Sequence, residues 1–276
     1  NLNKKYGFLK KSIRFSEFKK IIKNSKKNKV RYIDTSINYS GVHKILGKLN
    51  LNKIKVITKI SIPTNNNINA ELWIKKIIKN IIRDLKTKSL YCVLIHNSNI
   101  LLNNKYKKYI LNLNELKKKG KIKKIGFSVY NLREAKILLK KYKFDILQVP
   151  LNIINQTFCD KNFLQNIRKK NIEIHARSIF LQGILLSKDL RKMKYFKRWR
   201  TFWKDYYNWL NKNRISGLTA CLSFINGVKN ISGYVIGIEN EKQFKQVLDC
   251  KIKKNLKFES FLSQKNKKLI DPSKWK

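Results

Sequence analysis

The chain has 276 residues, of which 42% are hydrophobic and 11% aromatic. This composition excludes a disordered chain and supplies a substantial core, so we predict a single domain over residues 1–276. The four cysteines lie far apart and only three histidines are present, which argues against a metal site and favours free thiols in a reducing cytoplasm. No apolar run approaches the ~18 residues that a membrane-spanning helix needs.

The chain is strongly basic, because 64 Lys and Arg against 16 Asp and Glu give a formal net charge of +48. One interpretation is a protein that binds nucleic acid or an anionic membrane. The other is a compositional bias toward Lys, Asn and Ile, which is favoured because the lysines are spread over nearly every segment. Such a bias is compatible with a preference for small anionic ligands such as nucleotides. Nucleic-acid binding is kept as an alternative function.

The predicted elements alternate between helices and strands along the chain. Amphipathic patterns predict helices at 15–27, 70–85, 111–120 and 131–142, with Gly120 as a C-cap and Asn131 as an N-cap. Short apolar runs bounded by polar residues predict seven strands, at 30–36, 55–60, 89–96, 123–129, 144–150, 172–178 and 232–238. Several of these runs are almost continuously apolar, as in parallel strands that are covered on both faces.

This alternation in one domain predicts a parallel α/β fold, and the seven strands fit a (β/α)8 barrel with one strand unaccounted for. The missing strand is expected to be the first, trimmed or poorly formed, because residues 1–12 contain no apolar run. A short basic tail is predicted from about residue 252, and residues 264–276 within it are expected to be mobile, with Trp275 docking on the barrel.

Polar residues follow the predicted strands at their carboxyl ends, where the catalytic groups of parallel barrels lie. They are Asp34, Tyr39, Lys59, His96, Ser128, Gln148, Arg177 and Ser178. Each residue alone is weak support for a site, because a lysine at a strand end is usually solvated and a lone histidine is more often structural. The order Asp, Tyr, Lys, His on successive strand ends is more specific.

Six segments, in the correct order, resemble motifs of the aldo-keto reductases. DTSINYSGVHKILGK (34–48) resembles D-T-A-x-x-Y-G-x-S-E-x-x-L-G, and KKKGKIKKIGFSVYN (117–131) resembles G-K-I-R-x-I-G-x-S-N. DILQVPLNIINQ (145–156) resembles Q-x-x-Y-N-x-x-x-Q. VITK (56–59), LIHNSN (94–99) and YVIGIENEKQFKQVL (234–248) resemble the lysine strand, the histidine strand and the dinucleotide-binding stretch. The resemblance covers nearly the whole chain and implies a barrel that reduces aldehydes or ketones with NAD(P)H.

Carried over by position, the resemblance implies a catalytic tetrad of Asp34, Tyr39, Lys59 and His96. Tyr39 would be the general acid, and the Lys59 ammonium would favour the phenolate of a group whose ordinary pKa is about 10. Asp34 would keep Lys59 charged and oriented. His96 would orient the carbonyl and donate a hydrogen bond to its oxygen.

The same resemblance implies the contacts of a nicotinamide coenzyme. Ser128 and Gln148 correspond to residues that hold the carboxamide. The pyrophosphate would be wrapped by Ser178, Leu181 and Gly183, and the adenosine side would be held by Gly237 and Gln243.

Three departures from the family pattern affect this coenzyme site. Val129 replaces the usual Asn, and Arg177 replaces the aromatic residue that stacks on the nicotinamide, where a planar guanidinium could stack instead. Near the adenosine side, Glu239 would repel the 2′-phosphate of NADP whereas Lys242 would attract it. The choice between NAD and NADP is therefore open.

The variants GFSVYN, QVPLNIINQTF and IEIHARSIFLQGILL resemble a bacterial subgroup that is associated with surface-polysaccharide and nucleotide-sugar gene clusters. A sugar or nucleotide-sugar carbonyl is the corresponding substrate hypothesis. A non-catalytic barrel that binds coenzyme as a regulatory or partner-binding subunit is a further alternative, against which the intact tetrad argues.

Residues outside these motifs are interpreted as structural. The basic and aromatic stretch at 191–210 could stack on bases, but the helical spacing of Trp199, Trp203, Tyr206 and Trp209 favours packing on the barrel. His43 is expected at the surface and His175 in a structural role.

Overall fold

The computed structural model describes residues 14–65, 67–191 and 193–275. Within them, seven parallel strands pair in chain order and form one sheet. The strands are β1 (Tyr32–Asp34), β2 (Lys55–Ile60), β3 (Leu90–Ile95), β4 (Ile122–Ser128), β5 (Ile146–Pro150), β6 (Glu173–Arg177) and β7 (Gly233–Tyr234). Each strand overlaps one of the predicted apolar runs, and β7 is much shorter than its run.

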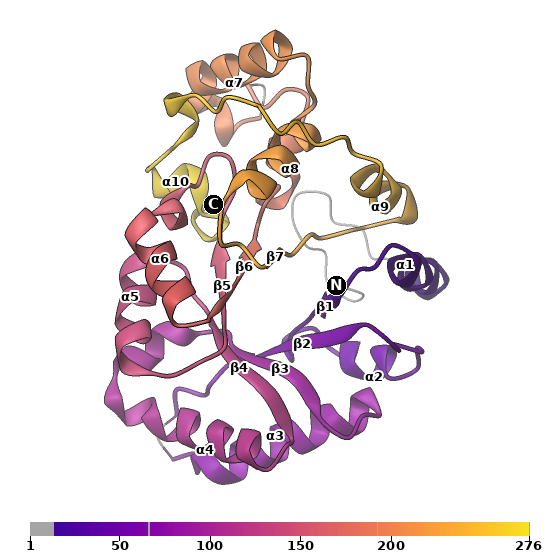
Figure 1. Ribbon diagram of the computed structural model, residues 1–276, viewed down its shortest axis with the longest axis vertical. Coiled ribbons are helices and arrows are strands. Elements are labelled where there is room, and N and C mark those ends of the chain that lie inside the picture. Colours follow the sequence, from indigo (N-terminus) through magenta and orange to yellow (C-terminus); the bar gives the residue numbers. More distant parts are fainter. Residues whose placement is uncertain (1–13, 66, 192, 276) are drawn as a thin grey trace.

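One helix precedes β1 and the others follow the strands, and together they lie on the outside of the sheet (Figure 1). They are α1 (Phe15–Lys27), α2 (Val42–Leu46), α3 (Ala70–Leu85), α4 (Lys107–Lys118), α5 (Leu132–Lys141), α6 (Lys161–Lys169), α7 (Arg200–Lys212), α8 (Gly217–Gly227), α9 (Glu241–Leu248) and α10 (Lys267–Ile270). The predicted caps are found: the Asn131 side chain accepts from the Glu134 amide, and Gly120 follows α4 with a φ of 68°.

The sheet curls around an axis, with β1 and β7 at its two edges (Figure 1). Contacts outside the strands link the two edges: Arg31 donates from Nη2 to the Ser232 carbonyl at 3.1 Å. Helices α1 and α9 also meet, because Asn24 donates to Glu241 Oε1 at 2.6 Å. The expected site of the missing first strand, residues 1–12, lies outside the described residues.

Two apolar clusters show which way each strand residue points. The large cluster joins the helices to alternate strand residues such as Val93, Ile95 and Phe127. The small cluster consists of Ile57, Cys92, Leu94 and Ile146 and contains no helical residue. Because side chains alternate along a strand, the small cluster fills the inside of the curl. Every second residue, counted from these four, therefore faces the interior.

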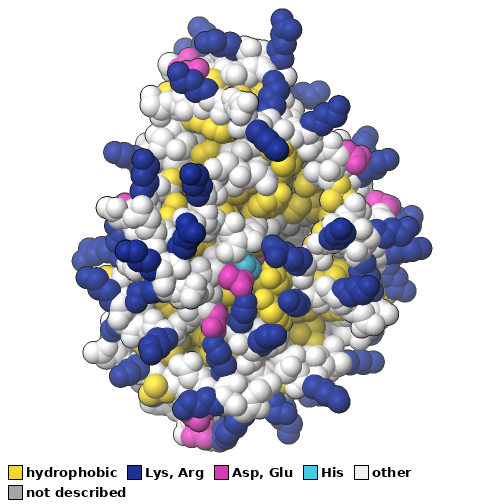
Figure 2. Space-filling view, in the orientation of Figure 1, with side chains coloured by type: hydrophobic (Ala, Val, Ile, Leu, Met, Phe, Trp, Pro, Cys, Tyr) yellow, Lys and Arg dark blue, Asp and Glu magenta, His cyan; other side chains and the backbone are white. Residues whose placement is uncertain are grey.

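The predicted helical stripe in the basic and aromatic stretch packs into the core. Trp203, Tyr206 and Trp209 of α7 are buried, and Tyr206 donates to the Leu185 carbonyl at 2.9 Å. Figure 2 shows Lys and Arg side chains around the whole outline of one face, with hydrophobic side chains between them. A nucleic-acid-binding surface is expected to gather its positive charge in one patch or stripe. On this face the positive charge is spread instead.

Residues 264–275, which were predicted to be mobile, contact the barrel, as do the residues just before them. Leu262 and Leu269 are fully buried, and the Gln264 amide donates to the Ile154 carbonyl at 2.8 Å. Trp275 packs edge-on against Phe196 with 5.1 Å between ring centroids. The segment packs on the barrel because Leu262 and Leu269 are part of the large apolar cluster.

His43 is buried, so the expectation of a surface histidine was wrong. It lies on α2, where its Nε2 is 2.8 Å from Thr58 Oγ1 of β2. Burial lowers the pKa of the His43 imidazole below its ordinary value of 6.5, and the nearby Asp84 carboxylate opposes this shift. The neutral ring is therefore the form that fits the fold.

We expect the free energy of unfolding to fall as the pH is lowered from about 7 to about 5. The unfolded chain binds a proton near pH 6.5, whereas the lowered pKa of folded His43 delays its protonation, so the unfolded state gains protons first. Each such group contributes a slope of at most about 1.4 kcal/mol per pH unit. Urea unfolding at several pH values measures the slope, and His43→Gln should flatten it. An equal slope in the variant would contradict the assignment.

Candidate active site

A buried ion pair joins the ends of β1 and β2. The Lys59 ammonium binds Asp34 Oδ2, and the two side chains are 5% and 15% exposed. Gln148, on β5, donates from Nε2 to the other carboxylate oxygen of Asp34 at 2.9 Å. The Thr35 carbonyl lies 3.4 Å from Lys59 Nζ. Burying two charges is costly unless both are paired and hydrogen-bonded, and here each charge has such partners.

Strand periodicity brings these residues together from distant parts of the sequence. Lys59 is two residues from Ile57, and Gln148 is two residues from Ile146, so both side chains point into the interior. Gln148 is fully buried although its side chain is polar. Its side-chain amide crosses the inside of the curl to reach β1. The Asp34 carboxylate therefore links β1, β2 and β5 through its contacts with Lys59 and Gln148.

Tyr39 lies in the turn between β1 and α2. Its amide donates to the Ser36 carbonyl at 3.0 Å, and its own carbonyl accepts from the Val42 amide at 3.1 Å. The ring is partly buried against the large apolar cluster. Both backbone bonds fix the start of α2, so the tyrosine is carried on a short and well-defined turn.

His96 follows β3 directly, and its amide donates to the Ile60 carbonyl at 2.8 Å. Its ring nitrogen Nδ1 lies 3.4 Å from Nδ2 of Asn38. Burial lowers the pKa of the His96 imidazole below 6.5. The positive charges of Lys59 and Arg177 lower this pKa further, and the Asp34 carboxylate opposes them. His96 is consequently neutral near pH 7.

Ser128 ends β4, and the loop after it is held by a buried acid that the sequence did not reveal. The Ser128 hydroxyl is buried and has no hydrogen-bond partner among the described residues. Glu134 is also buried and accepts from the Ser98 hydroxyl at 2.6 Å and from the Tyr130 amide at 3.0 Å. Ser98 in turn contacts the Ser128 carbonyl at 2.8 Å. In the sequence, the acidic residue near the start of α5 is the only indication of these contacts.

Arg177 ends β6 and is held by the β4–α5 loop. Its Nη2 donates to the Val129 carbonyl at 3.0 Å, and its guanidinium lies 4.5 Å from the ring centroid of Tyr130. The Arg177 Nε atom is buried without a partner among the described residues. Two positions that depart from the family pattern, Val129 and Arg177, are thus in direct contact.

The segment after β6 has an unusual backbone. Ser178, Leu181, Gln182 and Gly183 have φ values of 60°, 45°, 53° and 86°. Left-handed conformations are costly for residues other than glycine and gather at functional sites. The Ser178 carbonyl is fixed by the Asn152 side chain at 3.0 Å.

The two remaining candidates lie beyond β7, apart from the contacts above. Gly237 is in the loop between β7 and α9, and Gln243 is in α9. The Gln243 side-chain oxygen accepts from the Glu239 backbone amide at 2.9 Å. The Gln243 backbone amide donates to Asn240 Oδ1, the N-cap of α9, at 2.8 Å. Gln243 therefore shapes the loop that enters α9.

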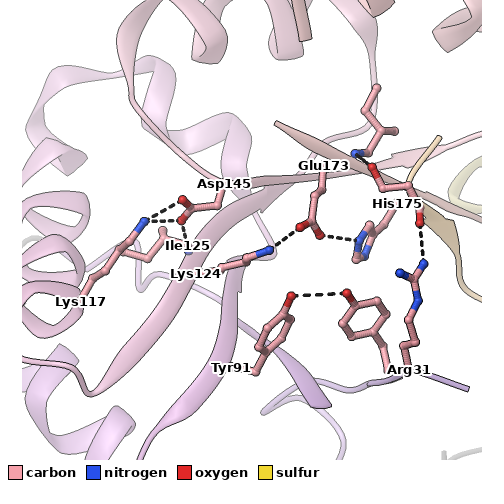
Figure 3. A network of polar contacts seen from close by, with 11 residues as sticks. Arg31, Tyr91, Lys117, Lys124, Ile125, Asp145, Glu173 and His175 are labelled. Carbon is pink, nitrogen blue, oxygen red and sulfur yellow. Dashed lines mark hydrogen bonds and ion pairs between the residues drawn. The ribbon is translucent and has the colours of Figure 1, made fainter. Parts of the chain in front are cut away.

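A second polar network occupies the opposite ends of the strands (Figure 3). Glu173 binds Lys124 and lies 3.3 Å from His175 Nε2, while the Tyr91 hydroxyl is 3.4 Å from that of Tyr32. Burial lowers the pKa of His175 below 6.5. This end of a parallel barrel serves stability, in agreement with the structural role expected for His175.

The described residues contain no group of three or more His, Cys, Asp and Glu side chains placed to hold a metal ion. Over the same residues, no helix has the length and apolar character needed to cross a bilayer.

Comparison with known proteins identifies the family of the chain. The family model for the aldo/keto reductase family matches residues 2–262. The chain belongs to the aldo/keto reductase family. No curated protein matches the chain in a sequence comparison.

Solved structures of the family share the fold. The aldo-keto reductase AKR11C1 from Bacillus halodurans, in its holo form, superposes with a TM-score of 0.71 at 17% identity, over 86% of this chain and 82% of that chain. The glycerol dehydrogenase AKR11B4 from Gluconobacter oxydans gives a TM-score of 0.65 at 18% identity, over 85% and 80%. The fold is therefore that of the aldo-keto reductase (β/α)8 barrel, of which the described residues supply seven strands.

Membership of the family implies an oxidoreductase, and aldo-keto reductases generally reduce carbonyl groups with NAD(P)H. The residues present fit such a coenzyme. The buried Ser128 hydroxyl lacks a partner where the resemblance implies a carboxamide. The left-handed residues Ser178, Leu181, Gln182 and Gly183 stand where it implies a pyrophosphate.

Proposed function

We propose that the protein reduces an aldehyde or ketone to an alcohol with NAD(P)H, using Tyr39 as the proton donor. The observation that carries this proposal is the buried pair of Lys59 and Asp34, which Gln148 completes. A purely structural barrel would gain little from two buried charges, because apolar residues of similar volume stabilise a core as well or better. A buried ammonium at a strand end is explained by a reaction that needs it.

The reaction adds a hydride to the carbonyl carbon and a proton to the carbonyl oxygen, while the coenzyme loses two electrons. When bound, the reduced nicotinamide supplies the hydride. Tyr39 gives its hydroxyl proton to the oxygen, and the Lys59 ammonium stabilises the phenolate that remains. Asp34 holds the ammonium in place. His96, being neutral, donates a hydrogen bond to the oxygen as negative charge develops there.

The proposed coenzyme contacts come from the remaining candidates. Ser128 and Gln148 would hold the carboxamide, and Arg177 would lie against the nicotinamide with Tyr130 on its other face. The segment from Ser178 to Gly183, with its four left-handed residues, would wrap the pyrophosphate. The loop that Gly237 and Gln243 shape would face the adenosine.

All four cysteines are free thiols, which supports the expected location in the reducing cytoplasm.

Stopped-flow oxidation of NADPH and of NADH, recorded against a panel of sugar, nucleotide-sugar and aryl aldehydes and ketones, tests this proposal. We expect coenzyme oxidation that depends on one class of carbonyl, with sugar or nucleotide-sugar carbonyls as the leading candidates. Tight coenzyme binding without oxidation on the whole panel would favour the non-catalytic barrel. Steeply salt-dependent binding of DNA without coenzyme binding would favour the nucleic-acid alternative.

The coenzyme preference should respond in opposite directions to two substitutions near α9. Glu239→Gln removes a negative charge from the adenosine side, so the Kd of NADPH should fall relative to that of NADH by up to about fivefold. Lys242→Gln should raise the same ratio by a similar factor. Titration of the reduced-nicotinamide fluorescence gives both Kd values. A shift in the same direction for both variants would show that neither side chain faces the 2′-position.

A further inference from the structure

Asn38 contacts the ring of His96 from the turn that carries Tyr39. The Asn38 side-chain nitrogen is 3.4 Å from His96 Nδ1 and donates to Ser61 Oγ at 3.1 Å. Its backbone is fixed as well, because the Asn38 amide donates to Ser36 Oγ at 3.2 Å. Among the described residues, Asn38 is the only side chain that hydrogen-bonds the His96 ring. Neither the resemblance nor the periodicity singled it out.

The chemistry of this contact determines where the proton of His96 lies. A neutral imidazole has one N–H group and one bare nitrogen, and the partner of each nitrogen decides which is which. An amide N–H donates only to a bare nitrogen, so Nδ1 is the acceptor and the proton is on Nε2. The two N–H groups of Asn38 then have separate acceptors, Ser61 Oγ and His96 Nδ1.

We propose that Asn38 is a positioning residue that holds His96 in the Nε2–H tautomer, so that Nε2–H is the donor to the substrate carbonyl oxygen. The part that concerns the substrate rests on the proposed function, whereas the tautomer itself does not. The charges near the ring, those of Lys59, Arg177 and Asp34, act on its protonation without a hydrogen bond to it. Asn38 thus selects which ring nitrogen carries the proton, whereas these charges do not.

Nitrogen-15 NMR of the imidazole rings, on the full chain labelled at histidine, reads the tautomer directly. The chain has three histidines, so a His96→Gln variant assigns the His96 signals by difference. In the unsubstituted protein near pH 7 we expect a protonated Nε2 and a bare Nδ1 on His96. A protonated Nδ1 there would overturn the proposal, whatever the activity.

Asn38→Asp is the decisive variant, because a carboxylate accepts a hydrogen bond where the amide donated one. We expect His96 to carry a proton on Nδ1 in this variant and kcat to fall by about 10²- to 10³-fold, as when a preorganised donor is lost. Coenzyme affinity should hold. Asn99→Asp, at an exposed position after β3, makes the same charge change at a residue that has no hydrogen bond to the ring among the described contacts, and it should leave both tautomer and kcat unchanged.

The two parts of the inference fail in distinguishable ways. If Nδ1 of His96 stays bare in Asn38→Asp, or this variant loses no more activity than Asn99→Asp, Asn38 does not set the tautomer. If the unsubstituted protein shows the Nε2–H form but oxidises no coenzyme with any carbonyl, the tautomer assignment stands and the proposed function is contradicted.

Discussion

Tyr39→Phe is expected to lower kcat by about 10²- to 10⁴-fold, because it removes the hydroxyl that protonates the carbonyl oxygen. The ring itself stays, so its packing against the apolar cluster and the start of α2 should be preserved. The Kd of the reduced coenzyme should change by less than about twofold, since the loss falls on the reaction and not on binding. Single-turnover kinetics and fluorescence titration separate the two quantities.

Tyr32→Phe provides the matched control for this variant. It also removes a phenolic hydroxyl, but from β1, at the opposite end of the barrel from the turn that carries Tyr39, where the Tyr32 hydroxyl makes a 3.4 Å contact with that of Tyr91. Its kcat should equal that of the unsubstituted protein. Full turnover in Tyr39→Phe, or an equal loss in both variants, would remove Tyr39 from the proposed chemistry.

Lys59→Met is expected to lower both activity and stability. The activity should fall by about 10²- to 10⁴-fold, because no ammonium remains to stabilise the phenolate of Tyr39. The free energy of unfolding should fall by about 3 kcal/mol, since the Asp34 carboxylate is left buried without its counter-charge. Urea unfolding and single-turnover kinetics measure the two effects on one preparation.

Lys55→Met tests whether such losses follow from any lysine of β2. Lys55 is exposed at the start of the strand, where its ammonium lies 4.8 Å from the Tyr91 ring centroid. We expect Lys55→Met to lower the free energy of unfolding by no more than about 1 kcal/mol and to leave kcat unchanged. A Lys59→Met protein as stable and active as Lys55→Met would show that the buried pair has no catalytic purpose.

The strands and the order of the polar residues at their ends were predictable because both depend on local signals. An apolar run of five or six residues between polar ends can be read without knowledge of its neighbours, as in 55–60. In a parallel barrel the carboxyl ends of all strands meet at one end, so Asp34 and Lys59 follow as neighbours once the strands are placed. The structure confirms this pairing.

The contacts that the sequence did not reveal join segments that are far apart in the chain. Asp34 and Gln148 are separated by 114 positions, and Asn38 and His96 by 58. Neither pair has a local pattern, because a glutamine in a strand or an asparagine in a turn is ordinary at its own position. Only the register of the whole sheet brings each pair into hydrogen-bonding distance.

The two wrong predictions, a surface His43 and a mobile C-terminal segment, have a related cause. His43 lies between polar and apolar residues in a short helix, and its burial depends on the Thr58 hydroxyl of the next strand. The C-terminal segment is rich in lysine, so its composition suggested a mobile tail. A few apolar side chains, Leu262 and Leu269 among them, outweigh that composition because each is fully buried.

Transfer of deuterium tests the central claim most directly. The protein is mixed with coenzyme that carries deuterium at C4 of the reduced nicotinamide and with the carbonyl that the panel identifies. We expect the product alcohol to carry deuterium on the former carbonyl carbon, at a rate that Tyr39→Phe lowers and Tyr32→Phe does not. Oxidation of the coenzyme without deuterium in the alcohol, or deuterium transfer at the same rate in Tyr39→Phe, would contradict the account.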